Sequence, residues 1–471
     1  MKSNRGISPD TLSRVVKMAI DTGEVASVEE GYALFTRYRL GVHVDAEASR
    51  SAAHQAALLT IINTGRRALL GGVLIAGQLD VPLLVDFPGG HSTLAIAARA
   101  LGATLVDILP ADIPALILGE TPKILSSVAL RVTFGGWKGG VIPADEDRAL
   151  GEESDAILPA IIAGALGVSE IFQNLRGNPM AAQRSVGISL WHPEILDWEI
   201  APPGPIDFVA PSRLWLIGLG HLGQAYLWVL GLLPYCTPGE VELTLQDFDN
   251  LTPANDSTSV LTTLDQVGEP KTRAMANWAE ARGFRTRLVE RRFSGDVSLQ
   301  EDDPRVALCG VDNLAARAAL EDAGFDLVVE AGLGAGPMEY LAMRLHIFPS
   351  SMSARKRWAS PGADAISPAG HAPAYTQLAE EGFDDCGLVQ LASRTVGAPF
   401  VGVVAAAMVI SEVIRRLNGA VGCEAVDLTL RDIRLRQVVP ATQGLRGFNP
   451  GFAELVSSES NISRRPVLGK S

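Results

Sequence analysis

Cysteine is scarce in this sequence, and its spacing excludes two kinds of fold. The chain has four cysteines in 471 residues, Cys236, Cys309, Cys386 and Cys423, and no Cys-x-x-Cys pair. A zinc ribbon needs such pairs, and a disulfide framework needs a denser set of cysteines, so neither is expected. A cysteine with a chemical role would therefore act alone.

Long runs of one charge or of apolar residues are also missing. The formal net charge is −13, but no cluster of Lys and Arg is interleaved with aromatic residues, so nucleic acid is not an expected partner. No stretch reaches the roughly 18 uninterrupted apolar residues of a membrane span, and the N-terminal sequence lacks the apolar core of a signal peptide. We therefore expect a cytoplasmic protein with no membrane partner.

The segment at 401–417 comes closest to a membrane span. It is interrupted by Ser411, Glu412 and Arg415, which recur at helical spacing. The pattern predicts a buried helix with one solvated side.

The length exceeds what one hydrophobic core usually serves, so two domains are expected. In each half, short apolar runs alternate with Gly, Pro and helix-like segments, which predicts two α/β units with largely parallel sheets. The expected segments are a helical N-terminus at 1–40, a first unit at 41–200, a proline-rich linker at 201–212, a second unit at 213–440 with a crossover and cysteine segment at 349–395, and a tail at 441–471.

A weak internal repeat links the two halves. A Ser-Glu pair ending at Glu170 and another ending at Glu412 precede similar amphipathic helix ends, which predicts a degenerate duplication. This alignment sets Gly77 opposite Gly218, and the first copy lacks the further glycines that follow Gly218. We therefore expect the first unit to be a reduced, inactive copy that cannot hold a nucleotide.

A glycine-rich turn opens the second unit. Gly218, Gly220 and Gly223 follow an apolar strand pattern and precede a helix pattern, the setting of a phosphate-binding turn. A later strand ends at Asp247 and Asp249, and an acid at that point can bind the ribose of either NAD or ATP. These residues alone leave the nucleotide open.

Three further side chains favour ATP. Asn255 lies eight residues after Asp247, and Lys271 opens a helix, where its ammonium adds positive charge near the helical N-terminal amides. Asp312 ends another strand and suits Mg²⁺ held beside phosphates. Together these residues predict a site for ATP and Mg²⁺. A redox enzyme is disfavoured because no Tyr-x-x-x-Lys or flavin constellation accompanies the glycine loop.

These motifs resemble the adenylation domain of E1-like activating enzymes, the family of ThiF, MoeB and the E1 enzymes of ubiquitin-like proteins. The Asp-x-Asp at 247–249, Asn255, the Gly-x-x-Lys ending at Lys271, and an Asp-Asn followed by Arg317 carry the resemblance, which covers residues 213–420. It implies an α/β fold with a Rossmann-like adenylation domain and a mostly parallel sheet.

The resemblance also implies roles for individual residues. The C-terminal glycine carboxylate of a small β-grasp protein would attack the α-phosphate of ATP and release pyrophosphate, while the enzyme aligns the two anions. Carried over to this sequence, Gly218, Gly220 and Gly223 would hold the nucleotide, Asp247 the ribose, Asn255 and Lys271 the phosphates, and Asp312 the Mg²⁺.

The sequence departs from the family pattern at several positions. Thr258 and Ser259 stand where the family has Arg and Gln, and the zinc-binding cysteine pairs of many relatives are absent. A further arginine of the family comes from a partner subunit or pseudo-repeat. Arg50 resembles it, and we expect it to reach the ATP. Ser393 stands where some relatives have a cysteine, so Cys386, seven residues earlier, is the predicted nucleophile.

Three functions remain open from the sequence. The first is an E1-like enzyme that adenylates a ubiquitin-like protein and passes it through a thioester on Cys386 to an E2-like carrier. The second is an adenylating enzyme for a sulfur carrier, without a thioester, and the third is a nucleotide-binding scaffold that has lost catalysis. The fused first unit favours the first function, and whether two chains form a homodimer is also open.

Overall fold

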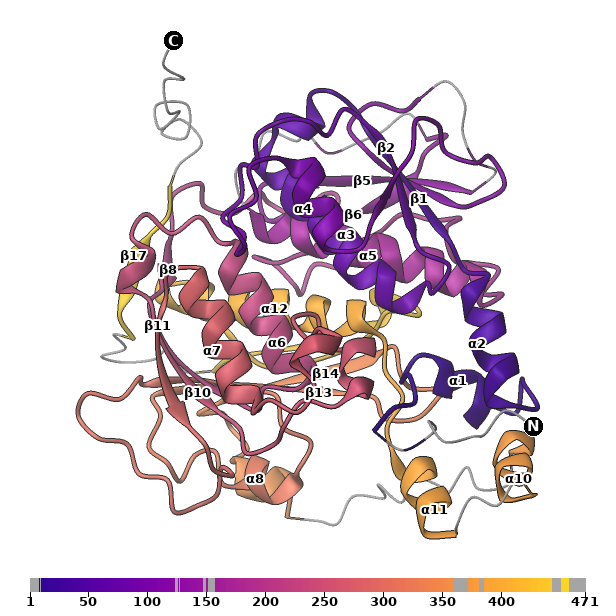
Figure 1. Cartoon of the computed structure of the whole chain (residues 1–471). Coiled ribbons are helices and arrows are strands. Elements are labelled where there is room, and N and C mark those ends of the chain that lie inside the picture. Colours follow the sequence, from indigo (N-terminus) through magenta and orange to yellow (C-terminus); the bar gives the residue numbers. More distant parts are fainter. Residues whose placement is uncertain are drawn as a thin grey trace.

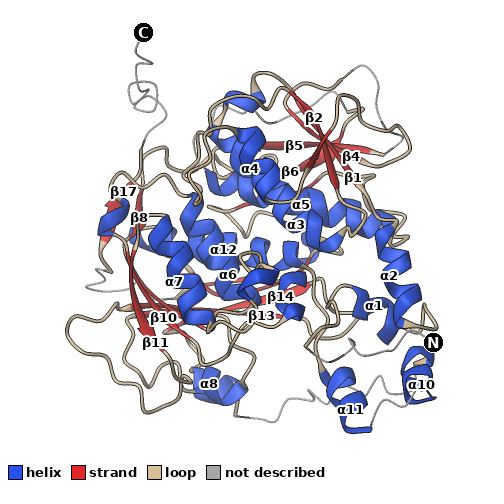
Figure 2. Cartoon of the chain, in the orientation of Figure 1, coloured by secondary structure: helices blue, strands red, loops and turns tan. Residues whose placement is uncertain are grey.

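The structure is a computed structural model, and its described residues form two large β-sheets with a layer of helices between them (Figure 1). It describes residues 8, 10–122, 126, 128–146, 150, 157–359, 372–380, 385–442 and 450–456, with the side chains of 385–387 outside that description. The helices between the two strand layers are drawn in blue in Figure 2.

The first sheet has the strand order β3-β2-β1-β4-β5-β6-β7. Strands β1 to β5 are parallel, and β6 and β7 continue antiparallel. Its strands are β1 Leu40–Val44, β2 Val73–Gly77, β3 Thr104–Leu105, β4 Ala115–Leu118, β5 Ala129–Gly135, β6 Lys138–Pro143 and β7 Val186–Ser189. The helices of this half are α1 Val16–Asp21, α2 Val28–Thr36, the 3₁₀ turn η1 Ala48–Arg50, α3 Ala52–Ala68, α4 Leu94–Ala100 and α5 Ile157–Leu175.

The second sheet has the order β11-β10-β9-β12-β13-β14-β15-β16, parallel from β11 to β13 and antiparallel beyond. Its strands are β9 Arg213–Ile217, β10 Glu242–Gln246, β11 Arg285–Val289, β12 Val306–Cys309, β13 Leu327–Leu333, β14 Ala342–Phe348, β15 Cys423–Thr429 and β16 Gln437–Pro440. A separate antiparallel pair joins β8 Val209–Pro211 to β17 Phe452–Glu454.

The second half also supplies helices and 3₁₀ turns. The α-helices are α6 His221–Leu232, α7 Lys271–Ala281, α8 Leu314–Ala318, α9 Ala354–Arg357, α10 Pro373–Glu380, α11 Asp385–Ser393 and α12 Pro399–Leu417. The 3₁₀ turns are η2 Pro238–Glu240, η3 Pro253–Ser257, η4 Leu264–Gln266 and η5 Ile433–Leu435. The expected α/β fold with mostly parallel sheets is therefore confirmed.

The two sheets repeat one topology. In each, the first strand is central, the next two strands extend one edge, and the chain then returns to the other side of the first strand. Strand β1 therefore corresponds to β9, and the alignment of Gly77 with Gly218 is wrong. Gly77 ends β2, the counterpart of β10, and the residue that follows the central strand β1 is Asp45.

The similarity of the two Ser-Glu pairs, at Glu170 and Glu412, has a structural basis in this repeat. Glu170 lies on α5 and Glu412 on α12, which are the corresponding helices of the two units. Glu170 accepts a hydrogen bond from the Ala182 amide at 2.9 Å, and Glu412 accepts one from the Cys423 amide at 2.9 Å. Each carboxylate ties its helix to the chain that follows it.

The predicted solvated side of the 401–417 segment is wrong. Ser411, Glu412 and Arg415 are all buried in α12. The Glu412 carboxylate accepts hydrogen bonds from Arg415 at 2.7 Å and from Arg416 at 2.6 Å, and this pairing offsets the desolvation of the charges. One described helix, α5, is long and apolar enough to cross a membrane by length and composition, and 94% of that stretch is buried inside the protein.

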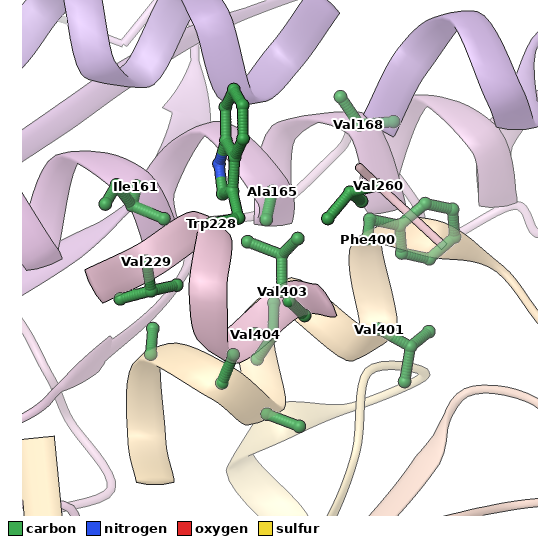
Figure 3. Packing of buried hydrophobic residues seen from close by; sticks show 14 of the residues in the cluster. Ile161, Ala165, Val168, Trp228, Val229, Val260, Phe400, Val401, Val403 and Val404 are labelled. Carbon is green, nitrogen blue, oxygen red and sulfur yellow. The ribbon is translucent and has the colours of Figure 1, made fainter. Parts of the chain in front are cut away.

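One hydrophobic core joins the two units. Helices α5, α6 and α12 pack through Ala165, Trp228 and Val403 (Figure 3). The Trp228 indole also donates to the Thr60 hydroxyl of α3 at 3.1 Å. The helix layer belongs to both sheets, so it fixes the position of one sheet relative to the other.

Phe400 tests the strength of this junction. It is fully buried at the start of α12, and its ring centroid lies 5.5 Å from that of Phe172 on α5. Phe400→Ala leaves a cavity and should lower the free energy of unfolding by about 3–5 kcal/mol in chemical denaturation. Phe452→Ala is the matched control, because Phe452 is 57% exposed. Equal losses in the two variants would contradict the shared core.

Candidate functional site

A cleft of about 640 Å³ opens at the ends of β9, β10 and β12. In this strand order, β9 and β12 are neighbours whose chains leave toward opposite sides, which is where open α/β sheets form a binding crevice. Six of the predicted site residues line the cleft: Gly218, Gly220, Asp247, Asn255, Lys271 and Asp312.

The glycine loop makes a turn that side chains would obstruct. Gly218 has a φ of +86°, in the left-handed region that favours glycine. A Cβ atom on Gly223 would lie 2.0 Å from the Gly218 carbonyl oxygen. Gly223 does not line the cleft. It lets the first turn of α6 pack against the loop, so that the helix begins at the cleft.

Asp247 links this loop to the next strand. It is 9% exposed, and its Oδ2 accepts a hydrogen bond from the Leu219 amide at 2.6 Å. Its Oδ1 accepts from the amides of Phe248 at 2.8 Å and Asp249 at 2.9 Å. The carboxylate therefore fixes the distance between the glycine loop and the end of β10.

Lys271 begins α7 and carries its ammonium toward these acids. Its Nζ lies 3.0 Å from Asp249 Oδ2 and 4.0 Å from Asp247 Oδ1, and its side chain is 11% exposed. Asn255 Oδ1 accepts a hydrogen bond from the Thr252 amide at 2.8 Å. This bond caps η3, the turn that borders the cleft. The lysine and the amide predicted from the sequence thus lie on one wall of the cleft.

Asp312 follows β12 on the other wall and is exposed. The described residues hold no group of three or more His, Cys, Asp or Glu side chains that could ligate a metal by themselves. Mg²⁺ usually binds proteins through one or two carboxylates plus substrate phosphates, so a single exposed carboxylate at this position fits it.

Sequence reasoning missed much of the positive charge in the cleft. The arginines that line it are Arg14, Arg291, Arg292, Arg317 and Arg394. Burial and, to a smaller extent, the nearby charge of Arg394 together lower the pKa of Arg14 to about 10. Such a concentration of cationic side chains is suited to a highly charged anion. Arg14 lies far from the motifs in sequence, which left no signal to identify it, and Arg394 opens the Arg-Thr-Val-Gly segment that resembles the family, but the resemblance gave it no role.

Arg50 is not brought to this cleft. It lies in η1 at the N-terminal end of α3, and it is not among the lining residues. The C-terminal end of α3 is the end that meets η3 beside the cleft, where Arg66 contacts Asp256 at 3.0 Å. A helix of 17 residues is about 25 Å long, which separates Arg50 from that contact.

The cysteines occupy different settings. Cys309 and Cys423 are buried, and burial raises their pKa values to about 12 and about 11, so both are core residues. Cys386 is the second residue of α11, and its side chain lies outside the described residues. Gln390 and Ser393 of the same helix line the cleft.

His221 is a cleft residue with an unusual setting. It is the first residue of α6, and a Cβ atom on Gly402 of α12 would lie 2.4 Å from its Nε2. Burial lowers the pKa of His221 to about 4, although a backbone hydrogen bond with Pro399 opposes that shift. The imidazole is therefore neutral near pH 7 and adds no charge to the cleft.

Comparisons with known proteins give two matching families and one close relative. The family described as the BilD N-terminal domain matches residues 39–190, and the BilD C-terminal domain matches residues 210–420. The bacterial E1-like protein BilD of Collimonas sp. (strain OK412) is 43% identical to this chain over 436 residues, which are 91% of this chain and 94% of that protein.

Solved structures resemble the chain more distantly. E. coli MccB is 14% identical with a TM-score of 0.32, covering 49% of this chain and 63% of MccB. PaaA is 18% identical with a TM-score of 0.33, covering 49% and 72%. TcdA (CsdL) is 20% identical with a TM-score of 0.21, covering 23% and 42%. In these matches the chain spans less than two thirds of the MccB structure and of the TcdA (CsdL) structure.

The setting of His221 predicts a pH-dependent stability. Its folded pKa of about 4 lies below its ordinary value of 6.5, so between these pH values the unfolded chain binds a proton that the folded chain excludes. The wild type should therefore lose about 1–3 kcal/mol more than His221→Asn as the pH falls from 6.5 to 4. Urea denaturation across this range measures the difference. Parallel pH profiles for the two proteins would refute the assignment.

Proposed function

Because this chain belongs to the family of the bacterial E1-like protein BilD, we propose that it adenylates the C-terminal glycine carboxylate of a ubiquitin-like protein at the expense of ATP. The observation that carries the proposal is the convergence of Gly218, Asp247, Lys271 and Asp312 on one arginine-lined cleft. A carboxylate and a triphosphate repel each other, so a site that joins them needs this much positive charge.

In the proposed site, each wall has a separate task. The glycine loop and the N-terminus of α6 offer backbone amides to the phosphates, since helix N-termini favour anions. Asp247 already accepts hydrogen bonds from three backbone amides, and because it lines the cleft, its carboxylate could also accept one from a ribose hydroxyl. Lys271 would neutralise phosphate charge, and Asp312 would hold Mg²⁺, which supplies further positive charge to the phosphates when bound.

The proposed reaction has two steps. A carboxylate oxygen of the protein substrate attacks the α-phosphorus, the bond from that phosphorus to the oxygen bridging the β-phosphate breaks, and pyrophosphate departs with its negative charge balanced by cationic side chains. The thiolate of Cys386 then attacks the acyl carbon, AMP leaves, and a thioester forms for transfer to an E2-like carrier. Helix α11 supports this second step because Gln390 and Ser393 line the same cleft.

We propose that the first unit binds no nucleotide. Asp45, which follows its central strand, accepts hydrogen bonds from the amides of Ala48 at 2.6 Å and Glu120 at 2.5 Å. The Asp45 carboxylate thus takes up the hydrogen bonds of two amides that would otherwise face a phosphate. Its negative charge would also repel a phosphate. The first unit then takes the place of a partner subunit, and one chain suffices without a homodimer.

Pyrophosphate exchange separates the candidate functions. With ATP, Mg²⁺ and a β-grasp protein ending in glycine, we expect ATP–pyrophosphate exchange and a thioester sensitive to reductant. Lys271→Ala should lower exchange by about tenfold or more through lost charge on the phosphates. Cys386→Ala should abolish the thioester and keep exchange, with Cys236→Ala as the matched control. Exchange without a thioester would favour the sulfur-carrier function, and the absence of both would favour a scaffold.

Arg14 and Arg50 form a second test. Arg14 lines the cleft and Arg50 does not, so Arg14→Ala should raise the KM for ATP in the exchange assay by about tenfold. Arg50→Ala should leave the KM unchanged. The reverse pattern would restore Arg50 as the arginine supplied by the first unit and would contradict the cleft described above.

A further inference from the structure

A buried carboxylate lies directly behind the cleft. Glu330 is on β13 and has no exposed surface. Its Oε1 forms an ion pair with Arg317 Nε at 3.1 Å, and its Oε2 is 2.7 Å from His346 Nδ1 on β14. The Trp358 ring covers His346 edge-on, with ring centroids 5.3 Å apart. The carboxyl group of Glu330 thus lies between Arg317 and His346 inside the sheet layer.

The sheet itself does not require a charge at this position. Val328, which shares its face of β13, and Cys309, its neighbour on β12, are buried and apolar in character, and an apolar side chain would pack there without a desolvation penalty. Ion pairs buried in this way contribute little net stability, although removal of one partner is strongly destabilising. A buried pair beside a cleft is therefore a candidate for a functional role.

The pair fixes the position of Arg317. Arg317 Nε donates its single hydrogen to the Val311 carbonyl at 2.8 Å, one residue before Asp312, so its contact with Glu330 Oε1 is an ion pair without a hydrogen bond. Its terminal nitrogens lie against Gly332, where a Cβ atom would be 3.2 Å from Nη1 and 3.3 Å from Nη2. The structure records no hydrogen bond from these terminal nitrogens to any described residue, and the side chain lines the cleft with 16% of its surface exposed.

We propose that Glu330, held in turn by His346, is a positioning residue that aims the guanidinium fork of Arg317 at a phosphate group bound beside Asp312. The inference rests on the proposed function and adds a part that the sequence motifs do not contain. A planar fork with Nε anchored can still donate two parallel hydrogen bonds from its outer edge, the geometry that matches phosphate oxygens. Because Gly332 has no side chain, it leaves the space that the guanidinium fork of Arg317 needs.

Binding of ATP to the full chain, measured by calorimetry with Mg²⁺ and no protein substrate, tests this role. Glu330→Gln keeps the shape and loses the charge, Gly332→Ala crowds the fork without altering the carboxylate, and Arg317→Ala removes the fork. Each should weaken ATP binding by about tenfold. Adenosine, which has no phosphate, should bind all four proteins equally.

A double variant separates positioning from a general effect. If Glu330 acts through Arg317, Glu330→Gln should cause no further loss of ATP affinity in the Arg317→Ala background. His346→Asn, which retains a donor near the position of Nδ1, should keep most of the affinity. Additive losses, an equal loss of adenosine binding, or full ATP affinity in Glu330→Gln would overturn the proposal.

Folding and the wider function are controlled separately. Thermal unfolding shows whether Glu330→Gln is folded, and if it is not, Gly332→Ala alone decides, because full ATP affinity in that variant would overturn the role of the fork. If the wild type binds ATP but catalyses no pyrophosphate exchange, the proposed adenylation function is refuted. The ATP-binding data would still decide the role of Glu330 in that case.

Discussion

The layer of helices between the two sheets is the constraint on which the rest of the structure depends. Helices α3 and α5 come from the first unit, α6 and α12 from the second, and their contact surfaces form one core. Burial of apolar surface is the main favourable term in folding, so neither sheet can move without loss of that contact. Helices α6 and α12 both begin at the cleft, and the same packing therefore holds two of its walls.

The N-terminal segment ties the remaining wall to this frame. Lys17 of α1 is buried, pairs with Asp21 at 2.5 Å, and donates to the Ala392 carbonyl of α11 at 3.3 Å. The Tyr375 hydroxyl of α10 donates to the same Asp21 at 2.6 Å. Because α1 directly follows Arg14 in the chain, one small polar cluster positions both a cleft arginine and the helix that contains Cys386.

The motifs of the second unit could be read from the sequence because parallel strands end at one edge. Gly218, Asp247 and Asp312 each follow a different strand, and adjacent strands bring such residues together whatever the loop lengths. The Arg14 side chain reaches the cleft from outside that sheet, and no local pattern predicts such a contact. The side of α12 expected to be solvated carries Glu412, whose burial depends on partners 3 to 11 residues later in the chain.

The internal repeat explains why one topology supports one predicted site and not two. After the second strand of each sheet, the first unit has Gln78 where the second has Asp247, and α4 begins with Leu94 where α7 begins with Lys271. Asp45 then places a negative charge where the second unit has a glycine turn. The backbone plan is shared, so the proposed difference in anion affinity would come from these few side chains, and a fold by itself assigns no function. Each unit would then contribute what the other lacks, the first a fixed support and the second a charged cleft.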